Sequence, residues 1–356
     1  MAVVPFPSPS GEYPVSIGPV RPDDLGALAG ERGNVFILAD RTAWELHGAG
    51  YADLGPVKTV EPGERSKTAE VWLDASRWLA AGGADRQALL VGFGGGMACD
   101  LAGFVAATYM RGIRHAFVAT TLLAQVDAAL GGKTAIDLPE GKNLVGAFHH
   151  PIAVFCDPRH LSTLDPRHLL NGMAEVIKYG FALDTALLDR LADGERTFRG
   201  APQQFFAEVA EWCCRLKARV VAEDPNDMLG IRAWLNFGHT VGHALEAAGG
   251  YERLLHGEAV AIGMCVECKV GERLGVCAPG LSEGVRALLS AWRLPHAPPE
   301  FISPEDVMQF LNLDKKATKR QGIALVVPKN PGECRLIEGV DPALIEEALV
   351  SEAPRG

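Results

Sequence analysis

The first 165 residues alternate between short apolar runs and helix-like patterns, and this alternation restricts the fold more than any other feature of the sequence. Short apolar runs are typical of strands that are buried on both faces of a sheet. We expect such strands at residues 35–40, 88–93 and 115–119, a weaker one at 57–60, and helices at 67–81 and 97–109. Strands that alternate with helices predict a parallel sheet with helices on its faces, so we expect an α/β amino-terminal domain.

Helical patterns dominate after Pro166. We expect helices at residues 166–180, 183–195, 202–223, 233–248, 256–274 and 281–292, and one clear late strand at 323–327. The change of pattern predicts two domains, an α/β domain over residues 1–165 and a mainly α-helical domain over 166–356. The tails before Tyr13 and after Ala348 are expected to be loosely ordered.

Composition excludes several classes of protein. The net charge of −10 argues against a general partner for nucleic acid or anionic membranes, so any anionic substrate needs a local group of Lys and Arg. We find neither a signal-peptide pattern nor an apolar run of membrane-spanning length, and expect a cytoplasmic protein. The eight cysteines are scattered, which speaks against a disulfide framework, and Cys265 and Cys268 form a CxxC without a second pair.

Three histidines lie close together in the sequence, and the spacing of the first two suits a metal. His239 and His243 are four residues apart, so they share one face of a helix, for which Asn236 is the expected N-cap. An HxxxH pair is a common way to present imidazoles to a divalent metal, although such a pair is also found as hydrogen-bonded core histidines. The third histidine, His256, favours the metal.

An acidic partner for these histidines is expected at Glu175. Glu175 and Lys178 are three residues apart on a predicted helix that ends at Gly180, and apolar residues surround them. A surface ion pair is the alternative interpretation. A buried carboxylate needs a partner, and a set of two histidines and one carboxylate is typical of catalytic zinc.

Two glycine-rich segments indicate binding of anions. Residues 94–100 follow an expected strand and open a helix, which suits a pyrophosphate, although a tight turn is the alternative. Residues 131–134 (GGKT) do not form a Walker motif, because Asp127 stands where that motif requires glycine. Positive charge gathers around this second segment and the histidines, at Arg111, Lys133, Lys142, Lys217, Arg232, Lys315 and Lys316, with Asn143 as a neutral hydrogen-bonding partner. A solvated loop with ordinary charges is the alternative.

Taken together, these segments resemble the 3-dehydroquinate synthase family between about Pro62 and Lys316. The matching blocks are Pro62–Lys67, Gly94–Phe104, Tyr109–Gly112, Thr120–Asp127, Gly131–Thr134, Gly141–Phe148, Ala174–Gly180, Leu235–His243 and Leu255–Met264. The resemblance implies a Rossmann-like NAD-binding domain, a helical metal-binding domain, an active site between them, and a homodimer in which Arg111 reaches the neighbouring subunit's phosphate site.

The resemblance also implies roles for individual residues. It assigns the metal, zinc or cobalt, to Glu175, His239 and His256, and leaves His243 to contact substrate. The NAD site would be formed by Asp40, Gly63, Glu64, Lys67, Gly95, Gly96, Met97, Asp100, Thr120, Thr121, Lys133, Lys142, Leu161 and Thr163. The substrate site would be formed by Arg111, Asp127, Lys133, Asn143, Lys178, Lys217, Arg232, Asn236, His243 and Lys316.

The implied reaction converts 3-deoxy-D-arabino-heptulosonate 7-phosphate into 3-dehydroquinate and phosphate, in the shikimate pathway to chorismate and the aromatic amino acids. It combines transient oxidation by NAD, loss of phosphate, re-reduction and an intramolecular aldol closure, with NAD supplying the redox chemistry. The alternatives are a related cyclase such as an aminodehydroquinate synthase, a metal-dependent polyol dehydrogenase, or a non-catalytic NAD-binding protein.

The sequence departs from the family pattern at three places. Thr42 stands where the family often has Asn beside the adenosine half of NAD. Residues 222–227 replace a more acidic loop and include Pro225. The interval from Lys217 to Arg232 is one residue longer than the family pattern, which bears on the carboxylate-binding role of Lys217.

Overall fold

The computed structural model describes residues 1–30, 34–194, 196, 201–224, 230–318 and 322–352, with the side chains of 313–318 left out. The chain forms two compact units, Met1–Asp165 with Ala201–Pro225 and Pro166–Gly200 with Asn226–Gly356. A single boundary after residue 165 does not describe this division, because helix α7 (Pro202–Glu223) packs on the first unit. No helix among the described residues has the length and apolarity to cross a membrane.

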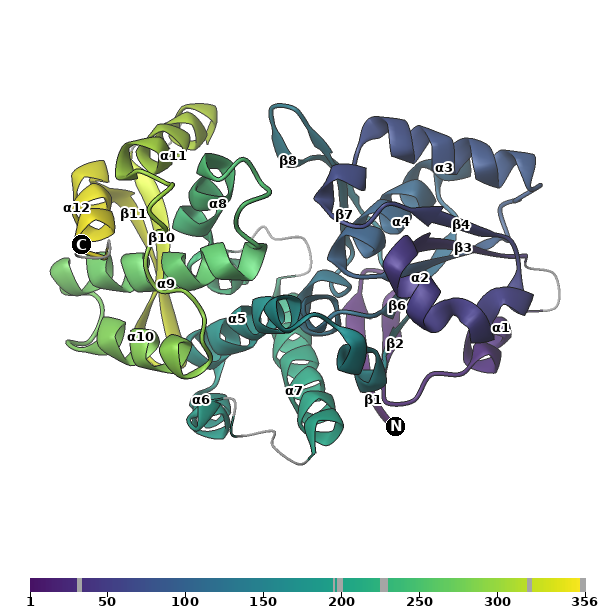
Figure 1. The fold of residues 1–356 in the computed structure, drawn as a ribbon, viewed down its shortest axis with the longest axis horizontal. Helices are drawn as coiled ribbons and strands as arrows, with labels where there is room; N and C mark the ends of the chain where they lie inside the picture. Colours follow the sequence, from purple (N-terminus) through teal and green to yellow (C-terminus); the bar gives the residue numbers. More distant parts are fainter. Residues whose placement is uncertain (31–33, 195, 197–200, 225–229, 319–321, 353–356) are drawn as a thin grey trace. The chain divides into compact units, whose positions relative to one another are not determined.

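The first unit is built on a seven-stranded sheet in the order β1-β2-β9-β6-β5-β3-β4 (Figure 1). The strands are β1 (Ala2–Ser8), β2 (Gly11–Ile17), β3 (Val35–Asp40), β4 (Val57–Val60), β5 (Leu89–Gly94), β6 (Arg114–Ala119) and β9 (Ala153–Cys156). β1 and β2 are antiparallel, and every other neighbouring pair in this sheet is parallel. The predicted parallel sheet is therefore confirmed.

Buried apolar residues explain the central strands. All six residues of β5 are buried, as a strand covered on both faces requires. Ile37, Val91 and Val118, from three adjacent strands, belong to one core cluster. The helices of this unit are α1 (Pro22–Ala29), α2 (Arg41–His47), α3 (Ala69–Ala81), α4 (Gly96–Thr108) and α7. Short 3₁₀ helices are η1 (Gly48–Leu54), η2 (Glu64–Ser66), η3 (Tyr109–Arg111) and η5 (Pro158–Thr163), and η4 (Ala124–Ala128) is a single π-helical turn.

Two hairpins were not expected from the sequence. β1 and β2 pair along their whole length, so the prediction of a loose tail before Tyr13 is wrong. β7 (Lys133–Leu138) and β8 (Gly141–Phe148) form a separate antiparallel pair, which begins with the last two residues of the GGKT segment and carries Asn143. The helix expected from Lys67 begins at Ala69, because the Thr68 side chain accepts a hydrogen bond from Val71 N and caps it.

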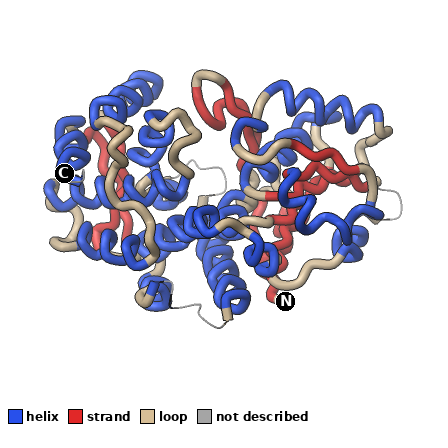
Figure 2. The backbone as a smooth tube through the Cα atoms, viewed as in Figure 1, coloured by secondary structure: helices blue, strands red, loops and turns tan. Residues whose placement is uncertain are grey.

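The second unit is mainly helical, with one pair of strands (Figure 2). Its elements are α5 (Pro166–Leu183), α6 (Thr185–Leu191), η7 (Arg232–Asn236), α8 (His239–Ala248), α9 (His256–Arg273), α10 (Leu281–Ala291), α11 (Pro304–Thr318), β10 (Ile323–Asn330), β11 (Glu333–Val340) and α12 (Pro342–Glu352). The sequence missed α11, β11 and α12, and the prediction of a loose tail after Ala348 is wrong for residues 349–352.

Helix α9 is the centre of the second unit (Figure 1). It packs against α5, α8, α10, α12 and β10, and thirteen of its residues are buried. All eight cysteines are free and buried, including Cys265 and Cys268 on α9, as the sequence predicted for a chain without a disulfide framework.

Candidate functional site

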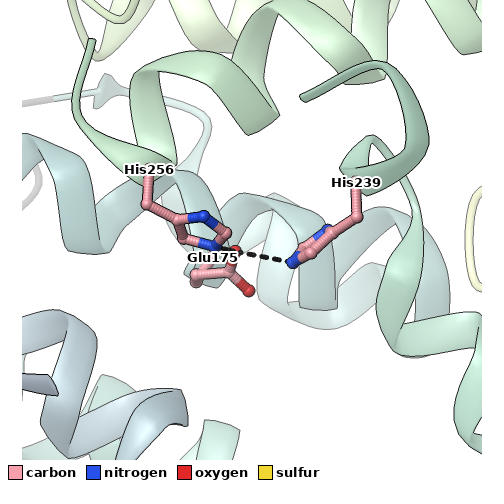
Figure 3. Close-up of side chains that lie close together, drawn as sticks. All are labelled: Glu175, His239 and His256. Carbon is pink, nitrogen blue, oxygen red and sulfur yellow. Dashed lines mark ion pairs between the residues drawn. The ribbon is translucent and has the colours of Figure 1, made fainter. Parts of the chain in front are cut away.

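Three side chains from different helices of the second unit meet at one point (Figure 3). Oε1 of Glu175 on α5 lies 3.5 Å from Nε2 of His239 on α8 and 3.4 Å from Nε2 of His256 on α9. Zinc bound tetrahedrally at about 2.0–2.2 Å spaces its ligands about 3.3–3.6 Å apart. The donor atoms therefore fit a divalent ion, with a fourth position left for water or substrate.

The position of His239 depends on a break in the chain just before it. The sequence predicted a continuous helix over 233–248, and it also predicted Asn236 as the N-cap of the helix with the histidines. Both predictions are wrong. Asn236 ends η7, and Gly238, with φ of 81°, is the N-cap of α8. Nδ1 of His239 lies 3.2 Å from the carbonyl oxygen of Phe237. A proton on Nδ1 can be donated to that carbonyl, which leaves Nε2 as the metal-binding atom.

His256 is held from its other ring nitrogen. Nδ1 of His256 lies 3.1 Å from Oε2 of Glu246, a buried carboxylate on α8. A carboxylate on the outer nitrogen fixes the orientation of a metal-binding imidazole. Sequence reasoning missed Glu246, although its place three residues after His243 on the predicted helix could have indicated it.

The start of α9 is tied to α5. Gly257 N donates to Asn171 Oδ1 at 2.5 Å, one helical turn before Glu175. Glu258 accepts from Leu255 N at 2.9 Å and from both Nε and Nη2 of Arg167. These contacts hold two of the three donor residues in register, and the sequence analysis gave neither Asn171 nor Glu258 a role.

Charge is distributed unevenly around the three donors. Lys178, 1% exposed, forms an ion pair with the fully buried Glu175, so the expected pair lies in the interior and not on the surface. Burial and the nearby Lys178 lower the pKa of His239 to about 3. Burial acts in the same direction on His256, but its hydrogen bonds to Glu175 and Glu246 outweigh burial and raise its pKa to about 10.

His243 shares a face with His239, as the spacing predicted, but its side chain is exposed. Its ring centroid lies 5.4 Å from that of His239 and 6.0 Å from that of His256. His243, Glu246 and His256 form a second group of possible ligands. Because that group shares His256 with the first, the two groups overlap.

In the first unit, Lys67 lies in a cluster of polar side chains. Its Nζ lies 3.2 Å from Glu64 Oε1, 2.7 Å from Asp100 Oδ2 and 2.5 Å from Asn143 Oδ1. Lys67 is 2% exposed, and although burial acts to lower its pKa, the surrounding carboxylates raise it. Asp137, which the sequence analysis missed, accepts from Asn143 N at 2.8 Å.

The turn between β5 and α4 approaches other parts of the first unit closely. Gly95 is the N-cap of α4, and a Cβ there would lie 2.9 Å from Cγ2 of Thr121. A Cβ on Gly96 would lie 3.1 Å from Cβ of Ala128. Backbone alone fits at this turn, so the first amides of α4, including that of Met97, are suited to an anion. Thr120 N donates to Gly94 O at 2.8 Å beside the turn.

The other residues assigned to NAD lie in strands, caps and short helices of the same unit. Asp40 ends β3 and caps α2 by accepting from Ala43 N at 3.0 Å. Leu161 and Thr163 lie in η5, and Oγ1 of Thr163 is 2.8 Å from Nε2 of His47. Gly63 lies at the N-cap of η2, and Lys133 and Lys142 lie in β7 and β8.

A further lysine of this unit pairs with Asp127. Nζ of Lys217 on α7 lies 2.5 Å from Oδ1 and 2.8 Å from the carbonyl oxygen of Asp127 in η4. The additional residue between Lys217 and Arg232 does not prevent this contact. Arg232 is buried in η7 of the second unit, and residues 225–229, with the Pro225 departure, lie outside the described residues.

Three further residues were expected to bind phosphate, namely Lys133, Arg111 and Lys316. Lys133 is exposed at the start of β7, and Arg111 is exposed in η3. Met110 and Arg111 have φ values of 50° and 67°. Two successive non-glycine residues in this conformation are uncommon, and such strain is often found at functional sites. The side chain of Lys316 lies outside the described residues, and its backbone belongs to α11.

Comparison with solved structures defines the class of fold as that of the dehydroquinate synthase-like cyclases. A 2-deoxy-scyllo-inosose synthase complexed with carbaglucose-6-phosphate, NAD+ and Co2+ superposes with a TM-score of 0.84 at 24% identity, over 99% of this chain and 100% of that one. The 2-epi-5-epi-valiolone synthase of Streptomyces hygroscopicus subsp. jinggangensis, with NAD+ and Zn2+ bound, also has a TM-score of 0.84 at 24% identity, over 99% and 98% of the two chains. An iron-containing alcohol dehydrogenase is more distant, with a TM-score of 0.64 at 15% identity, over 98% and 99%.

Sequence comparison then identifies the family. The 3-dehydroquinate synthase N-terminal model matches residues 57–171, and the C-terminal model matches 172–317. The 3-dehydroquinate synthase of Symbiobacterium thermophilum is 42% identical over 95% of this chain and 97% of its own length, and that of Pseudoalteromonas translucida is 38% identical over 94% and 97%. The chain belongs to the 3-dehydroquinate synthase family, which confirms the resemblance seen in the sequence.

Proposed function

We propose that the chain catalyses the conversion of 3-deoxy-D-arabino-heptulosonate 7-phosphate into 3-dehydroquinate and phosphate, as a carbon–oxygen lyase that depends on NAD and a divalent metal. The observation that carries the proposal is the meeting of Glu175, His239 and His256 at distances that suit a tetrahedral ion, in a chain of this family. The reaction neither oxidises nor reduces the substrate overall, so no NADH accumulates.

The metal centre is assigned to Glu175, His239 and His256, and the ion bound there, zinc or cobalt, would act as a Lewis acid toward substrate oxygens. Glu246 orients His256 by accepting from its Nδ1. Lys178 places a positive charge beside Glu175. His243, exposed beside His239, is assigned to contact with substrate.

NAD is assigned to the first unit, where the nicotinamide would supply a reversible hydride acceptor. The turn at Gly95 and Gly96 offers backbone amides to the pyrophosphate. The Lys67 cluster holds Glu64, Asp100 and Asn143 in place around one buried ammonium group. The other assigned residues are Asp40, Gly63, Met97, Thr120, Thr121, Lys133, Lys142, Leu161 and Thr163.

The substrate is an anion with a phosphate and a carboxylate, and the chain offers separate cations for each. Lys133 and Arg111, with Asn143 and Lys316, are assigned to the phosphate. Arg232 and Lys217 are assigned to the carboxylate, and Asn236 to the same part of the site. Asp127, which Lys217 holds at 2.5 Å, and Lys178 are assigned to the ring hydroxyls. We further propose a cytoplasmic homodimer, with Arg111 contributed to the partner's site.

The test measures phosphate release from the substrate with NAD and zinc present, while absorbance records dehydroquinate and NADH. Chelator-sensitive phosphate release without net NADH is the expected result. Glu175→Gln should abolish it, whereas Glu211→Gln, which removes only a surface ion pair with Arg215, should not. NADH formed from a simple polyol without phosphate release would instead establish a polyol dehydrogenase. Cyclisation of another sugar phosphate or of the amino analogue, in place of this substrate, would establish a related cyclase.

A further inference from the structure

Glu267 is a fully buried carboxylate that no step above uses. It lies on α9, eleven residues after His256, and its side chain points at the start of α8. Gly238 N donates to its Oε2 at 2.8 Å, and Val241 N donates to its Oε1 at 3.0 Å. Both oxygens therefore bind backbone amides on either side of His239.

A capping box at the start of a helix provides acceptors for two backbone amides, the amide of the N-cap residue and the amide of the third helical residue. In α8 these are the two amides that Glu267 binds. The N-cap of α8 is Gly238, which has no side chain to accept from Val241 N. Glu267 accepts both bonds from a neighbouring helix. Within its own sequence α8 therefore lacks the usual cap, and α9 supplies it.

The backbones of α8 and α9 touch one helical turn away from this carboxylate. A Cβ on Gly263 would lie 2.0 Å from the carbonyl oxygen of Gly238. A Cβ on Gly242 would lie 3.2 Å from Cα of Val260. The start of α8 is thus pressed on α9 with no side chain between them, and Glu267 holds it there through two hydrogen bonds.

We propose that Glu267 is a positioning residue for the metal centre, which fixes His239 relative to His256. His256 is the first residue of α9, and Glu267 lies three turns further along the same helix. One rigid helix therefore carries one imidazole and holds the amides that flank the other. This inference rests on the proposed metal centre, and it assigns Glu267 a role through His239 and not through contact with metal or substrate.

Glu352 provides a matched control in the same unit. It is also a buried carboxylate, 4% exposed, and it accepts from Lys269 Nζ at 3.0 Å and from Arg286. These two partners lie on α9 and α10, and neither of them is a proposed ligand. Substitution at residue 352 removes a buried carboxylate without freeing the amides of α8.

The experiment measures the zinc affinity of the full chain by competition with a chromophoric chelator, in the variants Glu267→Ala, Glu267→Gln and Glu352→Ala. Circular dichroism first sets a temperature at which each variant is folded. Loss of an outer-shell partner costs about 10–100-fold in metal affinity, so Glu267→Ala should raise the zinc Kd at least tenfold. Glu267→Gln keeps one acceptor oxygen and should raise it less, and Glu352→Ala should leave it within about twofold of the wild type.

The visible absorption of bound Co2+ gives a second readout, because it reports the geometry of the ligands. It should change in Glu267→Ala and stay unchanged in Glu352→Ala. An unchanged zinc Kd and Co2+ spectrum in Glu267→Ala, or in Glu267→Gln if the alanine variant does not fold, overturns the proposal. So does an equal loss of affinity in Glu352→Ala, because Glu267 would then matter only for general stability. Failure of the wild-type protein to bind zinc would instead remove the metal centre itself, and the proposed function with it.

Discussion

Replacement of Gly263 by alanine tests whether the α8–α9 contact controls the proposed active site. The added Cβ would lie 2.0 Å from the carbonyl oxygen of Gly238, whereas a relaxed C···O contact is about 3.3 Å. The first turn of α8, with His239, must then move by about 1.3 Å. Overpacking of this kind costs about 1–3 kcal/mol, and the better helix propensity of alanine offsets about 1 kcal/mol of it.

We therefore expect the free energy of unfolding of the second unit to fall by up to about 2 kcal/mol, measured by urea denaturation. A displacement of 1 Å at a reacting centre can cost about a hundredfold in rate, so phosphate release should fall by about that factor. The loss of activity should exceed what the loss of stability explains, because the protein remains folded at the assay temperature.

Gly284→Ala on α10 is the matched control, because it makes the same change in a helix of the same unit. Nothing lies within 4 Å of a Cβ built on Gly284, so this variant should be more stable by about 0.4–1 kcal/mol and fully active. If Gly263→Ala is as stable and as active as Gly284→Ala, the reasoning is refuted, since α8 would then yield without moving His239.

Three further outcomes are expected. His256→Ala should lose zinc in a metal assay and keep its far-UV circular dichroism, and wild-type metal content would contradict its assignment as a ligand. Lys67→Met leaves Glu64 and Asp100 without their shared cation, so the free energy of unfolding in urea should fall by roughly 3 kcal/mol. Calorimetry should show a weaker affinity for NAD, and unchanged values of both would show that the cluster is dispensable. Burial lowers the pKa of His160 to about 4, below its unfolded value of 6.5, so neutral His160 stabilises the fold above pH 6.5 and this stabilisation is lost as the pH falls toward 4. The free energy of unfolding should drop over this range by up to about 3 kcal/mol more in the wild type than in His160→Gln, and equal pH profiles would contradict the shift.

The parallel sheet could be predicted because its central strands are buried on both faces, which leaves an apolar run in the sequence. The β1–β2 hairpin was missed because Pro5 and Pro7 argue against a strand, although β1 is an edge strand, where proline is tolerated. The break at Gly238 was missed for a different reason. It is set by the close approach of α9, a contact between residues far apart in the sequence. A glycine at position 238 indicates that some group can come close, but it does not show that the helix breaks there.

The candidate site shows the same division. Residue types and spacing pointed to the histidine segment and to Glu175, but spacing alone favoured His243 with His239, and the family resemblance was needed to select His256. The structure brings Glu175, His239 and His256 together. Glu246, Asp137 and Glu267 each bind a partner on another helix or strand, or at its start. Their roles depend on how these elements pack, which the sequence could not specify.

The placement of α7 has a consequence for how the chain matures. The chain leaves the first unit after Asp165, completes α5 and α6 in the second, and returns to the first for Ala201–Pro225 before leaving again. Eleven residues of α7 are buried, and its partners include β1 at the very start of the sequence. During synthesis, amino-terminal segments emerge first and fold as units where they can. Here β1 can pair with β2 at once, but the packing of the first unit is complete only after α7 has emerged, some 200 residues later. A gene cut after residue 165 would therefore encode a sheet with an uncovered apolar face, and not an independent domain.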